Sequence, residues 1–88
     1  MEKILVGKKP AMDYVLNTVS RLSDENELEI LARGKNISKA VDVAEILKNR
    51  FREDLNKREI NIDTDKYTAD DGKERKISSI SIKLSKNV

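Results

Sequence analysis

The hydrophobic and polar positions in the first third of the chain follow two periods, which predict a strand, a helix and a second strand. Residues 3–6 include a short apolar run that Gly7 ends, as expected of a buried strand. Residues 12–22 place apolar side chains three or four positions apart, which is typical of an amphipathic helix, and Pro10 suits its first turn. Alternation over residues 28–33 predicts the second strand. The stripe of the helix consists of Met12, Val15, Leu16, Val19 and Leu22.

A second helix is predicted after Gly34, which breaks the second strand. Apolar side chains recur at helical spacing over residues 40–51. They are Ala40, Val41, Ala44, Leu47 and Phe51, with Val43 and Ile46 widening the stripe. This helix is more apolar than one face of a small core requires. We therefore expect Phe51, which ends the helix among basic residues, either to cap the core or to contact another protein.

The last third of the chain predicts a β-hairpin. Ile, Thr and Leu alternate with polar residues over 60–64 and again over 80–84, as in two half-buried strands. Asp71-Gly72 between them is a strong hairpin-turn signal. Ile77 lies out of phase with the apolar residues of the last strand. This offset predicts a bulge or a change of exposure near Ser78-Ser79.

Together these elements predict an α+β two-layer sandwich of order β-α-β-α-β-β, in a single domain over residues 1–88. Both helices are expected on one face of a mixed four-stranded sheet, and right-handed crossovers make the first three strands parallel. Three segments then emerge at the carboxyl-terminal edge of the sheet, namely residues 7–10, 33–38 and 69–76. A chain of 88 residues buries a thin core, which a second subunit would strengthen.

The net charge of +2 conceals a strong segregation of charge along the chain. Positive blocks at residues 1–12, 33–52 and 72–88 alternate with negative blocks at 13–32 and 53–71. The basic residues at the predicted sheet edge all lie in the positive blocks, and lysine and arginine there can neutralise phosphates and release counterions. We call this set the basic edge. It consists of Lys8, Lys9, Arg33, Lys35, Lys39, Lys73, Arg75 and Lys76.

Catalysis finds little support in the residue types. The chain lacks histidine and cysteine, whereas nucleophilic schemes couple a serine or cysteine to a histidine base. It has no P-loop or dinucleotide-binding motif and no apolar run as long as a membrane helix. Asp63 and Asp65 share one strand face and could bind a divalent cation, but a solvated edge strand is the simpler interpretation. We therefore predict no enzyme, no cofactor, no metal site and no membrane contact.

Two classes of binding protein remain. Nucleic acid is favoured by the basic edge, and the scarcity of aromatic residues favours contact with a duplex backbone over base stacking. The alternative is a protein–protein adaptor that uses the apolar second helix and Phe51, whose binding would be insensitive to salt. The charged fraction of 39% and the absence of cysteine resemble the composition of thermophile proteins.

Three stretches carry a family resemblance: ILVGKKPAMDYVLNTV, LEILARGKNISKAVDVAEILKNRF and DGKERKISSISI. They resemble, in order and over nearly the whole chain, the Alba family of small archaeal DNA- and RNA-binding chromatin proteins. The resemblance implies a fold similar to the C-terminal domain of translation initiation factor 3. It also implies a cytoplasmic, chromosome-associated homodimer whose basic loops sit over a DNA duplex and whose hairpins reach along it. The alternative ligand is RNA. The same surface would then bind RNA, and the protein would act as an RNA chaperone or a ribonucleoprotein subunit.

The resemblance also assigns roles to individual positions. It implies that Lys8 and Lys9 contact phosphate and are candidates for acetylation, and that Phe51 joins adjacent dimers on DNA. Lys35 stands where many family members have arginine, so the charge is kept but the bidentate fork to phosphate is lost. Asp13 stands where asparagine is frequent in the family. The predicted nucleic-acid-binding residues are Lys8, Lys9, Arg33, Lys35, Asn36, Lys39, Lys73, Arg75 and Lys76.

Overall fold

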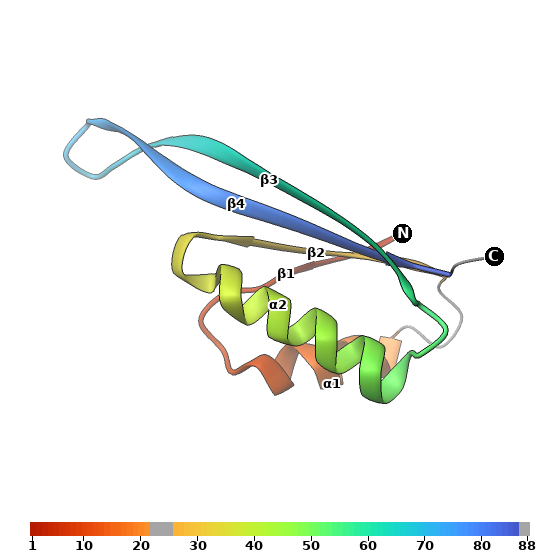
Figure 1. Cartoon of the computed structure of the whole chain (residues 1–88). Coiled ribbons are helices and arrows are strands. Elements are labelled where there is room, and N and C mark those ends of the chain that lie inside the picture. Colours follow the sequence, from red (N-terminus) through yellow and green to blue (C-terminus); the bar gives the residue numbers. More distant parts are fainter. Residues whose placement is uncertain (22–25, 87–88) are drawn as a thin grey trace.

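The computed structural model describes residues 1–21 and 26–86, and it confirms the predicted order β-α-β-α-β-β (Figure 1). Leu22, the last position of the predicted first stripe, lies outside these residues. The strands are β1 (Glu2–Leu5), β2 (Glu27–Arg33), β3 (Lys57–Thr68) and β4 (Glu74–Ser85), and the helices are α1 (Ala11–Arg21) and α2 (Ile37–Ile46). A 3₁₀ turn, Gly34–Asn36, precedes α2, and a π-helical turn, Leu47–Phe51, extends it.

The sheet has four strands in the order β1-β2-β4-β3, with both helices on one face, as the α+β two-layer class predicts (Figure 1). β1 pairs parallel to β2, and β4 pairs antiparallel to both β2 and β3. The first three strands therefore point the same way, as expected. The register aligns Ile4, Ile30 and Ile82 across three strands, and all three are buried in the core.

The buried face of α1 differs from the predicted stripe. Met12 and Leu16 are 38% and 55% exposed, whereas Val15 and Thr18 are fully buried. Tyr14 is partly buried against the core. The prediction for Met12 and Leu16 was wrong because it followed apolar residues alone, while a polar threonine and a tyrosine occupy inward positions of this helix.

The β3–β4 hairpin forms an arm that extends beyond the rest of the sheet (Figure 1). Its pairing runs without interruption from Lys57 opposite Ser85 to Thr68 opposite Glu74, so the predicted bulge is absent. The alternative, a change of exposure, is confirmed, because buried residues alternate only from Ile80 onward. No helix covers the outer half of the arm in Figure 1. Side chains on both faces of that half are therefore exposed to water, even where apolar and polar residues alternate.

The third strand shows the same effect. Ile60 and Ile62 alternate as predicted, and their partners Ile82 and Ile80 on β4 are buried. Yet Ile60 is 59% exposed and Ile62 is 79% exposed. β3 lies at the edge of the sheet and supplies none of the buried core residues, which come from the other three strands, the helical segments and two loop positions, Val6 and Leu55. An apolar strip thus continues the core face out into solvent.

Candidate nucleic-acid interface

The loop between β1 and α1 presents Lys8 and Lys9 to solvent on an anchored backbone. Both lysine side chains are exposed, and neither forms an ion pair within the described residues. The backbone N–H groups of Gly7 and Lys9 donate hydrogen bonds to the Oη atom of Tyr14, at 2.9 and 3.2 Å. The two charges therefore stand on a turn whose path is held from within α1.

The loop between β2 and α2 lies beside the first loop. Gly34 adopts a φ of +53°, a left-handed conformation that turns the chain into the 3₁₀ segment carrying Lys35 and Asn36. Lys35 is exposed, whereas Asn36 is partly buried. Lys39, at the start of α2, is also partly buried and donates from Nζ to the carbonyl oxygen of Gly7 at 2.7 Å. This bond joins the two loops directly.

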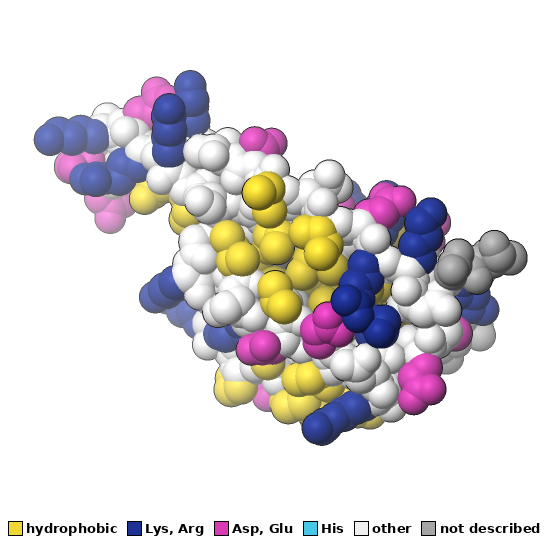
Figure 2. Space-filling model, viewed as in Figure 1, with side chains coloured by type: hydrophobic (Ala, Val, Ile, Leu, Met, Phe, Trp, Pro, Cys, Tyr) yellow, Lys and Arg dark blue, Asp and Glu magenta, His cyan; other side chains and the backbone are white. Residues whose placement is uncertain are grey.

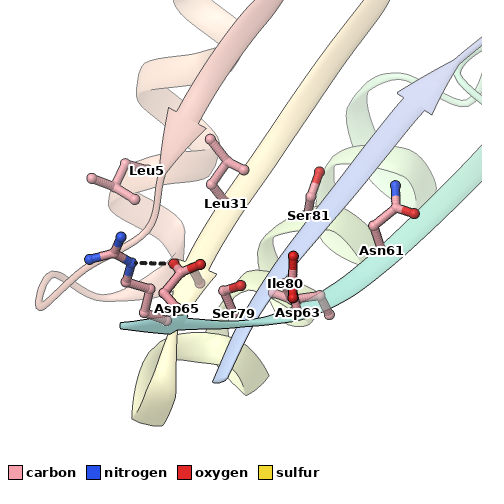
Figure 3. Close-up of a pocket in the computed structure, with 10 residues that line it drawn as sticks. Leu5, Leu31, Asn61, Asp63, Asp65, Ser79, Ile80 and Ser81 are labelled. Carbon is pink, nitrogen blue, oxygen red and sulfur yellow. Dashed lines mark hydrogen bonds and ion pairs between the residues drawn. The ribbon is translucent and has the colours of Figure 1, made fainter. Parts of the chain in front are cut away.

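Arg33 is already paired. Its Nε atom lies 2.9 Å from Oδ2 of Asp65 on β3, and its side chain is 57% exposed. Figure 3 shows this ion pair at a groove of about 570 Å³ on the sheet face opposite the helices. Leu5 and Leu31 line the groove from β1 and β2, and Asp63 lines it from β3. One cation of the basic edge is thus partly neutralised before any ligand binds.

The tip of the arm carries mixed charges (Figure 2). Arg75 donates from Nη2 to Oδ2 of Asp71 at 2.9 Å, and Lys66 lies 3.7 Å from Glu74. Lys73 and Lys76 are exposed, and their ammonium groups form no ion pair in the described part of the chain. The predicted turn at Asp71-Gly72 is present, and Gly72 has a φ of +81°.

The structure divides the predicted binding residues into two groups rather than one converged surface. The loop group lies at the edge of the sheet where the two loops meet, and the arm group lies at the far end of the hairpin (Figure 1). The loop group consists of Lys8, Lys9, Arg33, Lys35, Asn36 and Lys39. The arm group consists of Lys73, Arg75 and Lys76. The expected convergence is therefore partial, because the long hairpin projects past the loops.

The sequence analysis did not predict two residues that belong to the interface, Tyr14 and Asp65. Tyr14 anchors the first loop, and Asp65 pairs with Arg33 across a strand that separates them. Asp65 was considered only as a metal ligand. Asp63 accepts a hydrogen bond from the N–H of Thr64 at 2.7 Å, and the described residues contain no cluster of three or more residues with metal-binding side chains. No local pattern in the sequence marks Tyr14 for this role, because its bond to Gly7 depends on how α1 packs beside the loop.

An apolar surface lies between β3 and α2, visible as the central patch in Figure 2. Ile60 and Ile62 are exposed on the core-side face of β3, since they pair with the buried Ile82 and Ile80, and Val41 on α2 is 41% exposed. Phe51, also 41% exposed, ends the π-helical turn after α2. Phe51 is therefore not a buried cap of the core.

The Alba family model matches residues 2–64. The chain belongs to the Alba family. It is 48% identical over 84 residues to the DNA/RNA-binding protein Alba of Thermoplasma volcanium, covering 94% of this chain and 93% of that one. It is 42% identical over 85 residues to the Alba protein of Methanococcus maripaludis, covering 94% and 96% of the two chains.

The solved structure of Alba from Thermoplasma volcanium superposes with a TM-score of 0.87 at 46% identity, covering 97% of this chain and all of that one. This agreement confirms the fold. Membership in this family also confirms the prediction that the chain is not an enzyme, since the relatives are named for binding. Within the described residues, no helix has both the length and the apolar character needed to cross a membrane.

Proposed function

We propose that this Alba protein binds double-stranded DNA without sequence specificity, as a dimeric architectural protein associated with the chromosome. The observation that carries the proposal is the pair Lys8 and Lys9, two cations that are exposed on an anchored turn and have no ion-pair partner among the described residues. The relatives named above are DNA/RNA-binding proteins, which supports a nucleic-acid ligand. Residues 1–88 act as one binding domain in this role.

Affinity would come mainly from phosphate contacts. Lysine acts as a point charge toward phosphate, and each neutralised phosphate releases counterions. Lys35 adds a third exposed cation beside the loop. Lys73 and Lys76 supply the arm with cations that pair with no carboxylate of residues 1–21 and 26–86. Such contacts position a protein on a duplex but carry little sequence information. Acetylation of Lys8 or Lys9 would remove one of these charges and weaken binding.

A second copy of the chain is the proposed occupant of the apolar surface between β3 and α2. Ile60, Ile62 and Val41 expose apolar area that a thin core leaves uncovered, and burying such area is favourable by about 25 cal/mol per Å². A dimer formed there carries two loop groups and two arms. Phe51 lies at the end of the α2 segment and is proposed to join adjacent dimers on DNA.

RNA is the alternative ligand of the same loops and arms. A chain that recognises phosphates through lysine point charges also fits the backbone of an RNA helix, where shape and 2′-hydroxyl groups replace base reading. The relatives are named as binding both DNA and RNA, which supports RNA as a second candidate ligand.

The test is a salt series with a fluorescent duplex of arbitrary sequence. We expect a log–log slope steeper than about −4, since each phosphate contact contributes roughly −0.9. The double variant Lys8→Ala/Lys9→Ala should flatten the slope and weaken binding. The control is Lys57→Ala/Lys86→Ala, which also removes two exposed lysines. These lysines lie outside the two basic loops, beside Glu59 and Asp54 respectively.

Absence of binding at low salt would refute the DNA proposal. An unchanged slope in the Lys8→Ala/Lys9→Ala variant would refute the loop as the contact site. Competition between equal lengths of duplex DNA and structured RNA then decides which ligand is preferred. Binding that is insensitive to salt and to the loop lysines would favour the adaptor hypothesis instead.

A further inference from the structure

The backbone of Gly7 is held from both helices at once. Its N–H donates to Tyr14 Oη of α1 at 2.9 Å, and its carbonyl oxygen accepts from Lys39 Nζ of α2 at 2.7 Å. The N–H of Lys9 donates to the same tyrosine oxygen at 3.2 Å. Both backbone polar groups of the residue preceding Lys8 are therefore satisfied by side chains of rigid elements.

The tyrosine is suited to be a fixed anchor. Its side chain packs against the core, and a phenolic oxygen has the acceptor capacity for the two N–H groups that it receives. A side chain with two rotatable bonds, held by packing, transmits the position of α1 to the loop. The position of the Lys8-Lys9 turn thus depends on a hydroxyl group that carries no charge.

Lys39 also holds the first loop by a hydrogen bond to the backbone of Gly7. Its ammonium is directed to a backbone carbonyl of the neighbouring loop, and its residue is partly buried, unlike Lys8, Lys9 and Lys35. A cation in this position keeps the two loops together. The resemblance to the family had placed Lys39 among the phosphate-binding residues, whereas its contact with Gly7 gives it another task.

We propose that Tyr14 and Lys39 are positioning residues that latch the Lys8-Lys9 loop from two helices, and that Lys39 is not itself a phosphate ligand. The effect on binding rests on the proposed function, but the latch itself does not. A loop that is ordered before binding does not have to lose its freedom on contact with the ligand, so the latch raises affinity without adding a contact.

The latch is tested first in the free protein. Tyr14→Phe removes one oxygen atom and no charge, and we expect the amide hydrogens of Gly7 and Lys9 to exchange several-fold faster by NMR. Tyr67→Phe is the matched control, because Tyr67 is 42% exposed on β3 and its loss of a hydroxyl should leave these two amides unchanged. Unchanged exchange at Gly7 and Lys9 in Tyr14→Phe would overturn the latch, whether or not the protein binds DNA.

The second readout is the salt slope of DNA binding. Tyr14→Phe and Lys39→Met should each weaken binding several-fold while leaving the slope unchanged, because the phosphate contacts in the complex remain the same. Lys35→Met should instead flatten the slope by roughly 0.9 for each lysine removed. A similar flattening in Lys39→Met would show that Lys39 contacts phosphate and would overturn its positioning role. A failure of the unmodified protein to bind DNA would refute the proposed function, and the exchange measurement would still decide the latch.

Discussion

Arg33 Nε and Asp65 Oδ2 lie 2.9 Å apart, although β4 separates the strands from which they come. The register places Asp63, two residues before Asp65, in the same row as Arg33 and Ser79, so the pair crosses the sheet diagonally. A cation of the loop group is thereby held on the open face of the sheet. A phosphate that uses Arg33 must compete with this carboxylate.

Asp65→Asn should therefore strengthen binding to DNA. An exposed ion pair contributes about 0.2–1 kcal/mol, so we expect affinity to rise by a factor of about 1.4 to 5 at low salt. Asp63→Asn is the matched control. It removes the same charge two residues before Asp65, from a carboxylate that accepts a hydrogen bond from the neighbouring N–H of Thr64. Equal effects in the two variants would indicate general electrostatics and would contradict a direct competition for Arg33.

Ile62→Asp should separate the proposed dimer. Ile62 is 79% exposed, so the substitution leaves the fold of one subunit intact but places an unpaired charge in the interface. Such a burial costs about 3 kcal/mol or more, which corresponds to at least about 100-fold in dimer affinity. Sedimentation equilibrium measures the change. Leu16→Asp, at a side chain 55% exposed on α1, should leave the dimer unaffected, and a dimer that survives Ile62→Asp would place the interface elsewhere.

Phe51→Ala should reduce cooperativity on DNA. Phe51 is 41% exposed, so its truncation removes little from the core. We expect unchanged affinity for a duplex that holds one dimer and a shallower titration on a duplex that holds several. Leu5→Ala removes a side chain that is 71% exposed on the other sheet face and serves as the control. Identical titrations of Phe51→Ala and the unmodified protein on the long duplex would exclude the dimer–dimer contact.

Gly34→Ala should destabilise the fold more than Gly72→Ala. Both glycines have positive φ. A Cβ added at Gly34 would lie 3.0 Å from Cδ1 of Ile77, whereas a Cβ added at Gly72 would have no neighbouring atom within 4 Å. We expect a loss of about 2–4 kcal/mol for Gly34→Ala and about 1–2 kcal/mol for Gly72→Ala in urea unfolding. Adding Ile77→Val to Gly34→Ala should restore part of the loss, and equal losses at the two glycines would contradict the close contact.

Asp54→Asn should change the acid side of the stability profile. The hydrogen bond from Arg52, followed by the charges of Arg52 and Lys86, holds the pKa of the Asp54 carboxyl below its usual range. Because the folded pKa is depressed, the stabilisation is present at neutral pH and is lost as pH falls through the folded pKa. Arg52 Nε and Asp54 Oδ1 are 3.0 Å apart, and an exposed pair of this kind contributes about 1 kcal/mol or less.

The unfolding free energies of Asp54→Asn and the unmodified protein should therefore differ at pH 7, begin to approach each other below about pH 4, and converge once pH falls below the lowered pKa of Asp54 in the folded protein. Asp70→Asn, at an exposed residue of the arm tip, should give the same profile as the unmodified protein. A constant difference between Asp54→Asn and the unmodified protein at all pH values would contradict the ion pair as the cause.

Much of the fold was predictable because local patterns encode it. Alternation and helical spacing depend only on which residues lie near one another along the chain, and they gave the correct type and order of β1–β4, α1 and α2 but not the 3₁₀ and π-helical turns beside α2. Prediction failed where partners from distant segments decide exposure. Thr18 is buried and Leu16 exposed because of how α1 is turned against the core. Ile62 is exposed because β3 is an edge strand.

The candidate site shows the same division. By itself the sequence determined the element order and the positions of the basic residues Lys8, Lys9 and Lys35, since these follow from residue type and short-range spacing. Its resemblance to known motifs indicated the family. Only the tertiary structure decided that Arg33 is paired and that Lys39 holds a loop, because Asp65 and Gly7 each lie 32 residues away along the chain. Hydrogen bonds and ion pairs act over a few ångströms in space, and no period in the sequence reports that distance.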